Sequence, residues 1–300
     1  LKDIAKECGC DMSTVSRALQ DSPRVKEVTK EKVRKAAEKL GYKPNVVARA
    51  LARGKSQVVA LLVPSLESIS EHLPAKFISQ YLLEYDYDLI ICQYHESKEM
   101  IKRQLNRIEQ GSADGVIIIG SEVSMTSLDE LLVDFSIPFL FLDRNSPNLK
   151  SQTITSANLQ ASKSITKKVL ANSDGLLHFY TRENLVTKKR LEGLMREVGN
   201  TPVISFKEDL TVFCKSNGIK RLGIIASVQE SVLNFLEMNK DLVSGLEVNV
   251  AVYDQWHGTT ENFNSVYVAI QDWKQISAKA VESIISLIDA KKLSTELIEV

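Results

Sequence analysis

The chain has 300 residues, of which 44% are hydrophobic and 25% charged, a composition typical of a globular protein larger than one small domain. Its longest apolar runs, at 58–63 and 116–119, fall far short of the roughly 20 residues that a membrane-spanning helix needs. The first residues form a charged stretch that does not resemble a signal peptide. We therefore expect a cytoplasmic protein with no membrane partner.

Charge is distributed unevenly along the chain. The 38 Lys and Arg balance the 38 Asp and Glu overall, but residues 1–57 hold 14 basic and 7 acidic side chains. This stretch therefore carries +7 and the remainder −7. A basic head on an acidic body indicates that the head binds a polyanion and the body does not.

The cysteines and histidines show no ligand pattern. Cys8 and Cys10 flank Gly9, but no second Cys or His pair follows them, as a zinc site would require. The sequence also lacks a Gly-rich dinucleotide fingerprint, a P-loop and a nucleophile elbow. We expect a reduced protein that is not an enzyme and holds no metal or cofactor.

Residues 1–41 read as three short helices. Positions 2–8 place apolar residues on one helical face, Gly9 ends that helix, and Asp11 is a good N-cap for a second helix at 12–20. A third helix is expected at 28–40, with Gly41 after it. Two short helices joined by a Gly-containing turn are typical of a helix-turn-helix.

The second helix has side chains suited to the major groove. Ser13, Thr14 and Ser16 are short enough to approach phosphates and base edges, and Arg17 can contact a guanine through two hydrogen bonds. Alternatively these side chains form only a solvated face, but the positive charge of the head favours DNA. The small-residue segment 45–54 is too short to be a stable helix alone and could fold against a partner copy and DNA.

Four blocks of the head resemble the lac repressor family of bacterial transcription regulators. They are DIA at 3–5, TVSRAL at 14–19, LGYKPN at 40–45 and ARALA at 48–52, and together they span nearly all of residues 1–56. The sequence departs from the family at Cys8 and Cys10, where small residues are usual, and at Lys26, where a Ser commonly caps the third helix.

The resemblance implies that two heads of a homodimer bind double-stranded, pseudo-palindromic operator DNA. In the family, paired hinge helices enter the minor groove and a Leu wedges a base step open, a role that would fall to Leu51. Met12, Ser13 and Arg17 would contact bases, while Thr14, Ser16 and Asn45 would hold the backbone. The predicted DNA-binding residues are Met12, Ser13, Thr14, Ser16, Arg17, Asn45, Ala48 and Leu51.

Beyond residue 57 strands alternate with helices, which predicts parallel sheets covered by helices on both faces. Nearly 240 residues of this pattern exceed one sheet, so two lobes are expected. The expected strands are 58–63, 87–92, 113–119, 138–142, 176–180, 203–205, 222–226 and 248–253. The expected helices are 73–85, 98–110, 128–135, 187–198, 232–239 and 276–287.

This body also resembles the family, whose effector domain has a fold like the periplasmic sugar-binding proteins. The predicted fold is thus an all-α helix-turn-helix head joined by a hinge helix to a two-lobed α/β body with parallel sheets. The predicted head is 1–44, the hinge 45–56 and the body 57–300. The first lobe is expected at about 57–155 and 271–292, and the second at about 156–270 and 293–300.

A ligand of such a body would lie between the lobes, at the carboxyl ends of the strands. An Arg and an Asp beside an aromatic ring suit a sugar or nucleoside. Alternatively, Arg190 closes the lobes through a salt bridge and Trp273 is a core residue. The candidate effector-binding residues are Ser65, Tyr94, Ser121, Asp143, Arg190, Ser227, Asp254 and Trp273.

Several departures remove ligand anchors that are usual in the family. Ser156 and Ala157 stand where an Asp-Asn pair is usual, Gln229 replaces an Asp, and residues 173–175 replace a Gly-His pair. Two functions therefore remain possible. The protein is a repressor controlled by a small-molecule effector, or it is a DNA-binding regulator with a degenerate pocket, controlled by a partner protein or not controlled at all. A solute-binding protein or an enzyme would not explain the basic head.

Overall fold

The computed structural model describes residues 1–42, 54–121, 124–143, 146, 148–149, 151–180, 184–290 and 297–300. The chain divides into two compact units, residues 1–56 and 57–300, which are described separately. The predicted hinge residues Asn45, Ala48 and Leu51 lie outside the described residues. No helix among the described residues is long and apolar enough to cross a bilayer.

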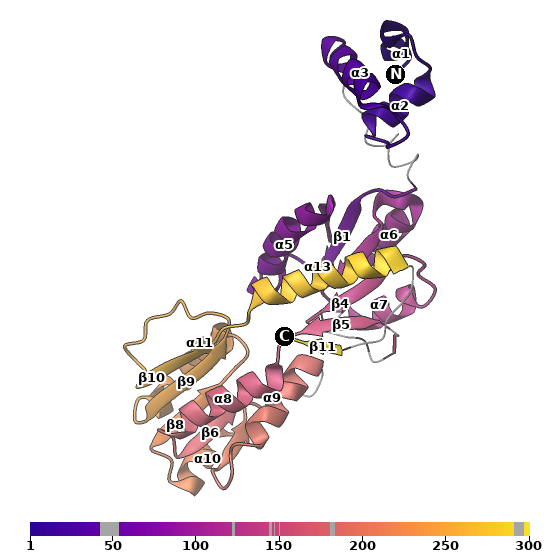
Figure 1. The fold of residues 1–300 in the computed structure, drawn as a ribbon. Helices are drawn as coiled ribbons and strands as arrows, with labels where there is room; N and C mark the ends of the chain where they lie inside the picture. The colour runs from indigo at the N-terminus through magenta and orange to yellow at the C-terminus, as the bar shows by residue number, and fades with distance from the viewer. Residues whose placement is uncertain are drawn as a thin grey trace. The chain divides into compact units, whose positions relative to one another are not determined.

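The head contains the three predicted helices, α1 (Lys2–Cys8), α2 (Met12–Leu19) and α3 (Glu27–Lys39) (Figure 1). Each helix turns its apolar stripe inward, so the three share one small core. Ion pairs connect α3 to α1 and to the residues after α2. Lys39 Nζ lies 2.7 Å from Glu7 Oε1, and Lys30 Nζ lies 3.0 Å from Asp21 Oδ1. The core residues are Ile4, Ala5, Cys8, Val15, Ala18, Val33, Ala36 and Ala37.

The first lobe of the body is built on a six-stranded parallel sheet. Its strands lie in the order β11-β5-β4-β3-β1-β2, which leaves β11 and β2 at the edges. The strands are β1 (Val58–Val63), β2 (Asp88–Gln93), β3 (Gly115–Ile118), β4 (Phe139–Leu142), β5 (Gln152–Thr155) and β11 (Leu297–Glu299). The helices are α5 (Ile69–Leu82), η1 (Leu83–Tyr85), α6 (Lys98–Arg107), η2 (Ile108–Ser112), α7 (Met125–Leu132) and α13 (Trp273–Ala290).

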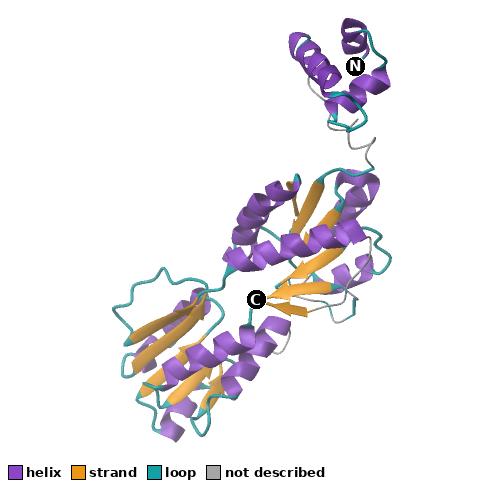
Figure 2. Cartoon of the chain, in the orientation of Figure 1, coloured by secondary structure: helices purple, strands orange, loops and turns teal. Residues whose placement is uncertain are grey.

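Alternate residues of β1 belong to two cores, because successive side chains of a strand point to opposite faces. Leu61 packs with α5 and α13 on one face, and Leu62 packs with α6 and α7 on the other. Figure 2 shows the helices on both sides of this sheet. The near-continuous apolar sequence of β1 is therefore that of a strand buried on both faces.

The second lobe has a five-stranded parallel sheet in the order β10-β9-β8-β6-β7. α8 and α9 cover one face, and α10 and α11 cover the other. The strands are β6 (Gly175–His178), β7 (Val203–Ser205), β8 (Arg221–Ile225), β9 (Glu247–Tyr253) and β10 (Ser265–Ala269). The helices are α8 (Asn158–Leu170), α9 (Leu185–Met195), α10 (Leu210–Asn217), α11 (Gln229–Met238) and α12 (Lys240–Val243).

The end of the chain lies in the other lobe from the one predicted. Residues 293–300 were expected in the second lobe, but β11 pairs with β5 of the first sheet, with Ile298 beside Ile154. The reason is that α13 packs on the first sheet, and a short connection returns the chain to the sheet that its helix covers.

Candidate functional site

The turn between α1 and α2 presents the start of α2 to solvent. Gly9 has a left-handed backbone (φ 63°, ψ 36°), which ends α1 and reverses the chain. Asp11 then caps α2, whose inner face buries Val15 and Ala18. The opposite face carries Met12, Ser13 and Arg17, all exposed. The structure therefore places these three predicted base-contacting residues together on one face of the second helix.

The hydroxyls of the first turn of α2 are already hydrogen bonded within the head. The Asp11 carboxylate accepts from the Thr14 backbone N–H at 2.8 Å, from Thr14 Oγ1 at 2.7 Å and from Ser13 Oγ at 2.5 Å. The Ser13 bond, followed by those of Thr14, holds the pKa of Asp11 well below its usual range. The sequence predicted Asp11 as the N-cap of α2, but it did not predict the hydrogen bonds that Asp11 accepts from both hydroxyls.

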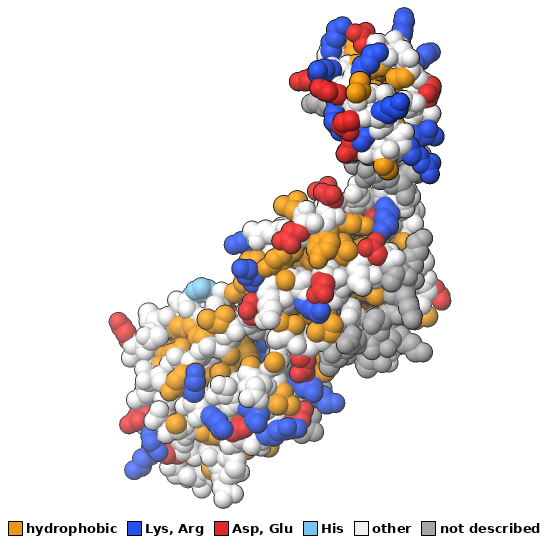
Figure 3. All heavy atoms as spheres, in the orientation of Figure 1, with side chains coloured by type: hydrophobic (Ala, Val, Ile, Leu, Met, Phe, Trp, Pro, Cys, Tyr) orange, Lys and Arg blue, Asp and Glu red, His pale blue; other side chains and the backbone are white. Residues whose placement is uncertain are grey.

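Basic side chains are frequent on the head. Figure 3 shows Lys and Arg over its visible face, interspersed with Asp and Glu. Arg17 lies on the outer face of α2, and Ser16 accepts a 3.4 Å hydrogen bond from Gln20 Nε2 on the same helix. This surface can contact both phosphates and base edges, as recognition helices of helix-turn-helix proteins do.

The body has a cavity of about 480 Å³ at the carboxyl ends of β1, β2, β3 and β4. Three predicted effector residues line it: Ser65 after β1, Ser121 after β3 and Asp143 after β4. Crevices at strand ends are where open α/β sheets bind ligands. The lining is Pro64, Ser65, Ser68, Ser70, Glu71, His95, Glu96, Ile119, Gly120, Ser121 and Asp143.

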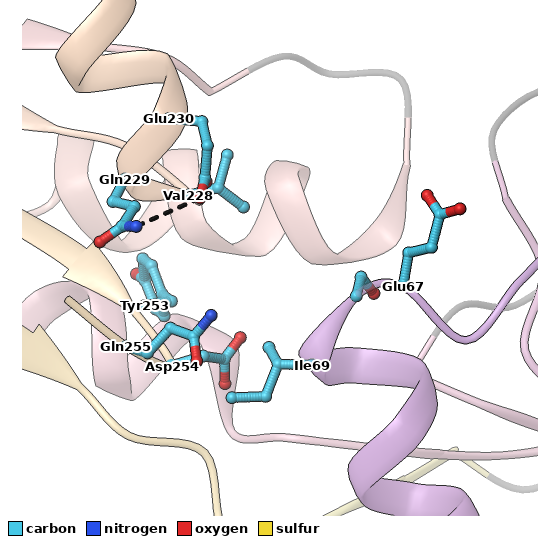
Figure 4. A pocket seen from close by; sticks show the side chains of 9 residues that line it. Glu67, Ile69, Val228, Gln229, Glu230, Tyr253, Asp254 and Gln255 are labelled. Carbon is cyan, nitrogen blue, oxygen red and sulfur yellow. Dashed lines mark hydrogen bonds between the residues drawn. The ribbon is translucent and has the colours of Figure 1, made fainter. Parts of the chain in front are cut away.

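A second cavity, of about 280 Å³, joins the two lobes (Figure 4). From the second lobe it is lined by Asp254 and Gln255 after β9 and by residues at the start of α11, and from the first lobe by Ile69 and its neighbours. Ser68 lines both cavities, so they adjoin. The full lining is Glu67, Ser68, Ile69, Val228, Gln229, Glu230, Tyr253, Asp254 and Gln255.

Asp143 and Asp254 occupy corresponding places in the two lobes. Each follows a strand, each has φ 66°, and each donates its backbone N–H to the next strand, Asp143 to Ile154 and Asp254 to Ala269. Left-handed backbone at a residue other than Gly is uncommon and occurs often at functional sites. The two carboxylates therefore mark the strand ends that face the cleft.

Asp254 is held at the junction of the lobes. Its carboxylate accepts from Gln271 Nε2, 2.9 Å from each oxygen, and from Trp273 Nε1 at 3.1 Å. Burial raises the pKa of Asp254, while Gln271, the Arg190 charge and Trp273 oppose that shift. Gln271 also accepts from the Ser156 hydroxyl. Ser156 and Gln271 lie on the two described segments where the chain crosses from one lobe to the other, so one side-chain amide connects both crossings.

Arg190 lies beneath the cleft surface and lines neither cavity. It is buried, its Nε donates to Asn158 Oδ1 at 2.9 Å, and its guanidinium carbon is 3.5 Å from the centre of the Tyr253 ring. Tyr253 in turn accepts from the Tyr180 hydroxyl at 3.0 Å. Arg190 forms no ion pair among the described residues, so the salt bridge considered as its alternative role is not seen there.

Three further predicted effector residues do not line the cavities. Tyr94 is fully buried in the first lobe, where its hydroxyl lies 2.8 Å from Ser124 Oγ and burial raises its pKa to about 12. Trp273 is a core residue, the alternative considered for it, although its indole nitrogen reaches Asp254. The Ser227 hydroxyl is buried without a hydrogen-bond partner among the described residues.

Several residues at the cleft were missed by sequence reasoning. Glu71 lines the first cavity and accepts from Ser65, and Ser68-x-x-Glu71 is a capping-box spacing that could have located the start of α5. Gln271 gave no signal, because its role depends on Ser156 and Asp254, which are distant in sequence. Within the described ranges, no three His, Cys, Asp or Glu side chains form a metal site, and the four cysteines are free thiols.

Comparisons with known proteins match both units. The model of bacterial regulatory proteins of the lacI family matches residues 1–45, and that of periplasmic binding proteins and the sugar binding domain of the LacI family matches residues 56–222. Catabolite control protein A of Staphylococcus aureus (strain MRSA252) is 26% identical over 263 residues, which cover 82% of this chain and 78% of that protein.

Solved structures agree in fold. The lac repressor dimer bound to operator and the anti-inducer ONPF has a TM-score of 0.74 at 18% identity, covering 99% of this chain and 94% of the other. The complex of the transcriptional regulator CelR with cellobiose has a TM-score of 0.63 at 16% identity, covering 100% and 96%. The chain belongs to the lacI family of bacterial regulatory proteins, which are DNA-binding transcription regulators with an effector-binding domain and not enzymes.

Proposed function

We propose that the protein is a repressor that binds a pseudo-palindromic operator as a homodimer and responds to a small molecule in the cleft of its body. The observation that carries the DNA-binding part is the exposed face of α2, where Met12, Ser13 and Arg17 stand together in a stretch, residues 1–57, of net charge +7. We infer that a protein with this role acts on the nucleoid, in the cytoplasm. Asn45, Ala48 and Leu51 remain predicted contacts of the hinge.

A second copy is proposed to bind along β2 in the first lobe. β2 is an edge strand, Ile91 on it is 44% exposed, and Leu83 and Tyr85 just before it are 68% and 43% exposed. Large apolar side chains beside an open strand edge favour association with another chain. A dimer would also supply the second head that tight specific DNA binding requires.

The effector is proposed to be a sugar or a nucleoside. The two adjoining cavities offer serine hydroxyls and carboxylates, which suit the hydroxyls of such a ligand, and Ile69 offers an apolar contact. A ligand that contacts Asp143 in the first lobe and Asp254 in the second would change the relative stability of the open and closed arrangements, and so could change operator affinity.

One observation favours the alternative regulator without a small-molecule effector. Arg190 and Asp254, the two charged residues expected to bind ligand in the second lobe, are both engaged by protein groups. Gln271 and Trp273 already occupy most of the acceptor sites of the Asp254 carboxylate, which leaves little of it for a ligand. In this second candidate the body dimerises or receives a partner protein, and the cleft binds nothing.

Two experiments test these functions separately. Selection of duplexes from a random pool by the intact chain should yield a two-fold symmetric site, and enrichment of no sequence would contradict operator binding. Thermal unfolding against sugars, sugar phosphates and nucleosides tests the effector, because a ligand at 100-fold over its Kd adds about 2.7 kcal/mol. If no compound raises the unfolding temperature, the second candidate is favoured. That result would not contradict operator binding.

A further inference from the structure

The hydroxyls at the start of α2 share one partner. Asp11 accepts from Ser13 Oγ and Thr14 Oγ1 while it caps the Thr14 N–H. Ser13 is exposed on the surface of the head. The N-terminal residues of the second helix of a helix-turn-helix are those that contact base edges. The hydrogen-bonding state of Ser13 therefore determines what kind of base group it can contact.

The chemistry of a carboxylate sets the direction of these bonds. An ionised Asp can only accept, and the lowered pKa of Asp11 keeps it ionised at neutral pH. A hydroxyl has one proton to donate. Ser13 and Thr14 each donate that proton to Asp11, so each hydroxyl presents only lone pairs to a further partner.

We propose that Asp11 is a specificity-determining residue of the head: by holding the Ser13 proton it makes the Ser13 hydroxyl an acceptor, which selects an amino group in the major groove. The groups that qualify are N6 of adenine and N4 of cytosine. Guanine N7 and O6, thymine O4 and phosphate oxygens are acceptors themselves and cannot bond to it. This inference rests on the proposed DNA-binding function.

The same reasoning separates Thr14 from Ser16, both of which the family resemblance assigned to the DNA backbone. The Thr14 proton is donated to Asp11, so its hydroxyl has none left for a phosphate oxygen. Ser16 accepts from Gln20 and keeps its own proton. The phosphate contact therefore falls to Ser16.

The test uses the intact chain and a duplex selected by it from a random pool. Each adenine of one half-site is replaced in turn by purine, which lacks the N6 amino group, and each cytosine by 2-pyrimidinone, which lacks the N4 amino group. Affinities of the wild type and of Ser13→Ala form a double-mutant cycle. At one position each change alone should weaken binding about fivefold, and both together also about fivefold, as for one shared hydrogen bond.

Matched variants give the control. 7-Deazapurines, which lack the N7 acceptor, should show additive effects with Ser13→Ala. Asp11→Asn keeps the helix cap through its side-chain oxygen, which at the Oδ1 position accepts from both the Thr14 N–H and Ser13, so the coupling of Ser13 to an amino group should persist. In Asp11→Gly the Ser13 hydroxyl can donate as well as accept, so the preference for a base with an amino group at the coupled position should relax. Thr14→Val should change affinity less than about twofold, since its hydroxyl has no proton for DNA.

Coupling of wild-type Ser13 to N7, coupling to no base group, or an unchanged base preference at the coupled position in Asp11→Gly would overturn the inference while operator binding stood. Failure of the chain to select any sequence would instead overturn the proposed function.

Discussion

The side-chain amide of Gln271 lies 2.9 Å from each carboxylate oxygen of Asp254. Gln271 lies on the chain crossing that leads into α13, and Asp254 directly follows β9 of the second lobe. Since Gln271 also binds Ser156 on the other described crossing, the amide links both crossings to the strand end that faces the cleft. One polar network therefore connects the two crossings between the lobes.

Gln271→Ala should destabilise the protein by about 2 kcal/mol at pH 7, because the buried Asp254 carboxylate loses two donors. Burial already raises the pKa of Asp254, so the folded state loses stability as pH rises through that pKa. Gln271 opposes this loss by stabilising the ionised form. The difference in the free energy of unfolding between the variant and the wild type should therefore become smaller as the pH falls from 7 through the pKa of Asp254. Urea unfolding at several pH values measures it. Ser156→Ala, which leaves Asp254 its donors, should show no such narrowing, and an equal pH dependence in both would contradict this role.

Arg17→Ala should weaken operator binding by about 1–3 kcal/mol and relax preference at one base pair, because Arg17 is exposed on the outer face of α2. Lys35→Ala removes the same charge from an exposed site on α3 and controls for general attraction to phosphates. Competition titrations against selected and random duplexes measure both. An equal loss on random DNA would show that Arg17 contacts only the backbone.

Ile91→Lys should convert a dimer to monomers. A two-fold interface would bring two added positive charges together, which costs on the order of several kcal/mol of binding free energy. Val133→Lys at the end of α7, also exposed, should leave assembly unchanged. Sedimentation velocity at micromolar concentration distinguishes the two states. A dimer in both variants would move the interface away from β2.

Gly193→Ala should destabilise the second lobe by about 1–3 kcal/mol, since an added Cβ would lie 2.4 Å from Leu159 O and 2.8 Å from Ser162 Cβ. Helix propensity alone predicts a gain of about 1 kcal/mol, so the sign of the change is diagnostic. Gly245→Ala, whose Cβ would lie 3.9 Å from its nearest neighbour, should have little effect. Denaturant titration gives both values, and a stabilised Gly193→Ala would contradict the close α8–α9 contact.

Asp143→Asn should reduce or abolish the thermal shift caused by the most effective sugar or nucleoside, because Asp143 lines the larger cavity. Asn tolerates the left-handed backbone at this position, so the fold should persist. Tyr94→Phe removes a buried hydrogen bond to Ser124 and should lower stability by about 1 kcal/mol without changing the response to ligand. The reverse pattern would place the ligand outside the cleft.

The head and most strands could be predicted because local signals determine them. Gly9 and Asp11 end and begin helices through their own backbone and side-chain preferences, and β1 matches its predicted bounds because it is apolar throughout. β5, with the sequence QTIT, escaped prediction because its buried threonines do not read as an apolar strand. α8 was missed because the residue before it, Ala157, makes no side-chain cap.

The residues of the cleft were predicted only in part, because their side-chain positions depend on the tertiary structure. The strand-end rule located Ser65, Ser121, Asp143 and Asp254, because parallel strands bring their carboxyl ends to one edge. It could not show that Tyr94 turns into the core or that Arg190 stacks on Tyr253. Those outcomes depend on side-chain packing between elements far apart in sequence.

The most direct test of sequence-specific binding is the ratio of affinities of the intact chain for its selected duplex and for a random duplex of equal length, at one fixed salt concentration. We predict a ratio of at least about 10³, with two chains bound per selected duplex. A ratio near one, with both affinities falling equally as salt rises, would show that the head binds only the phosphate backbone and would contradict the account.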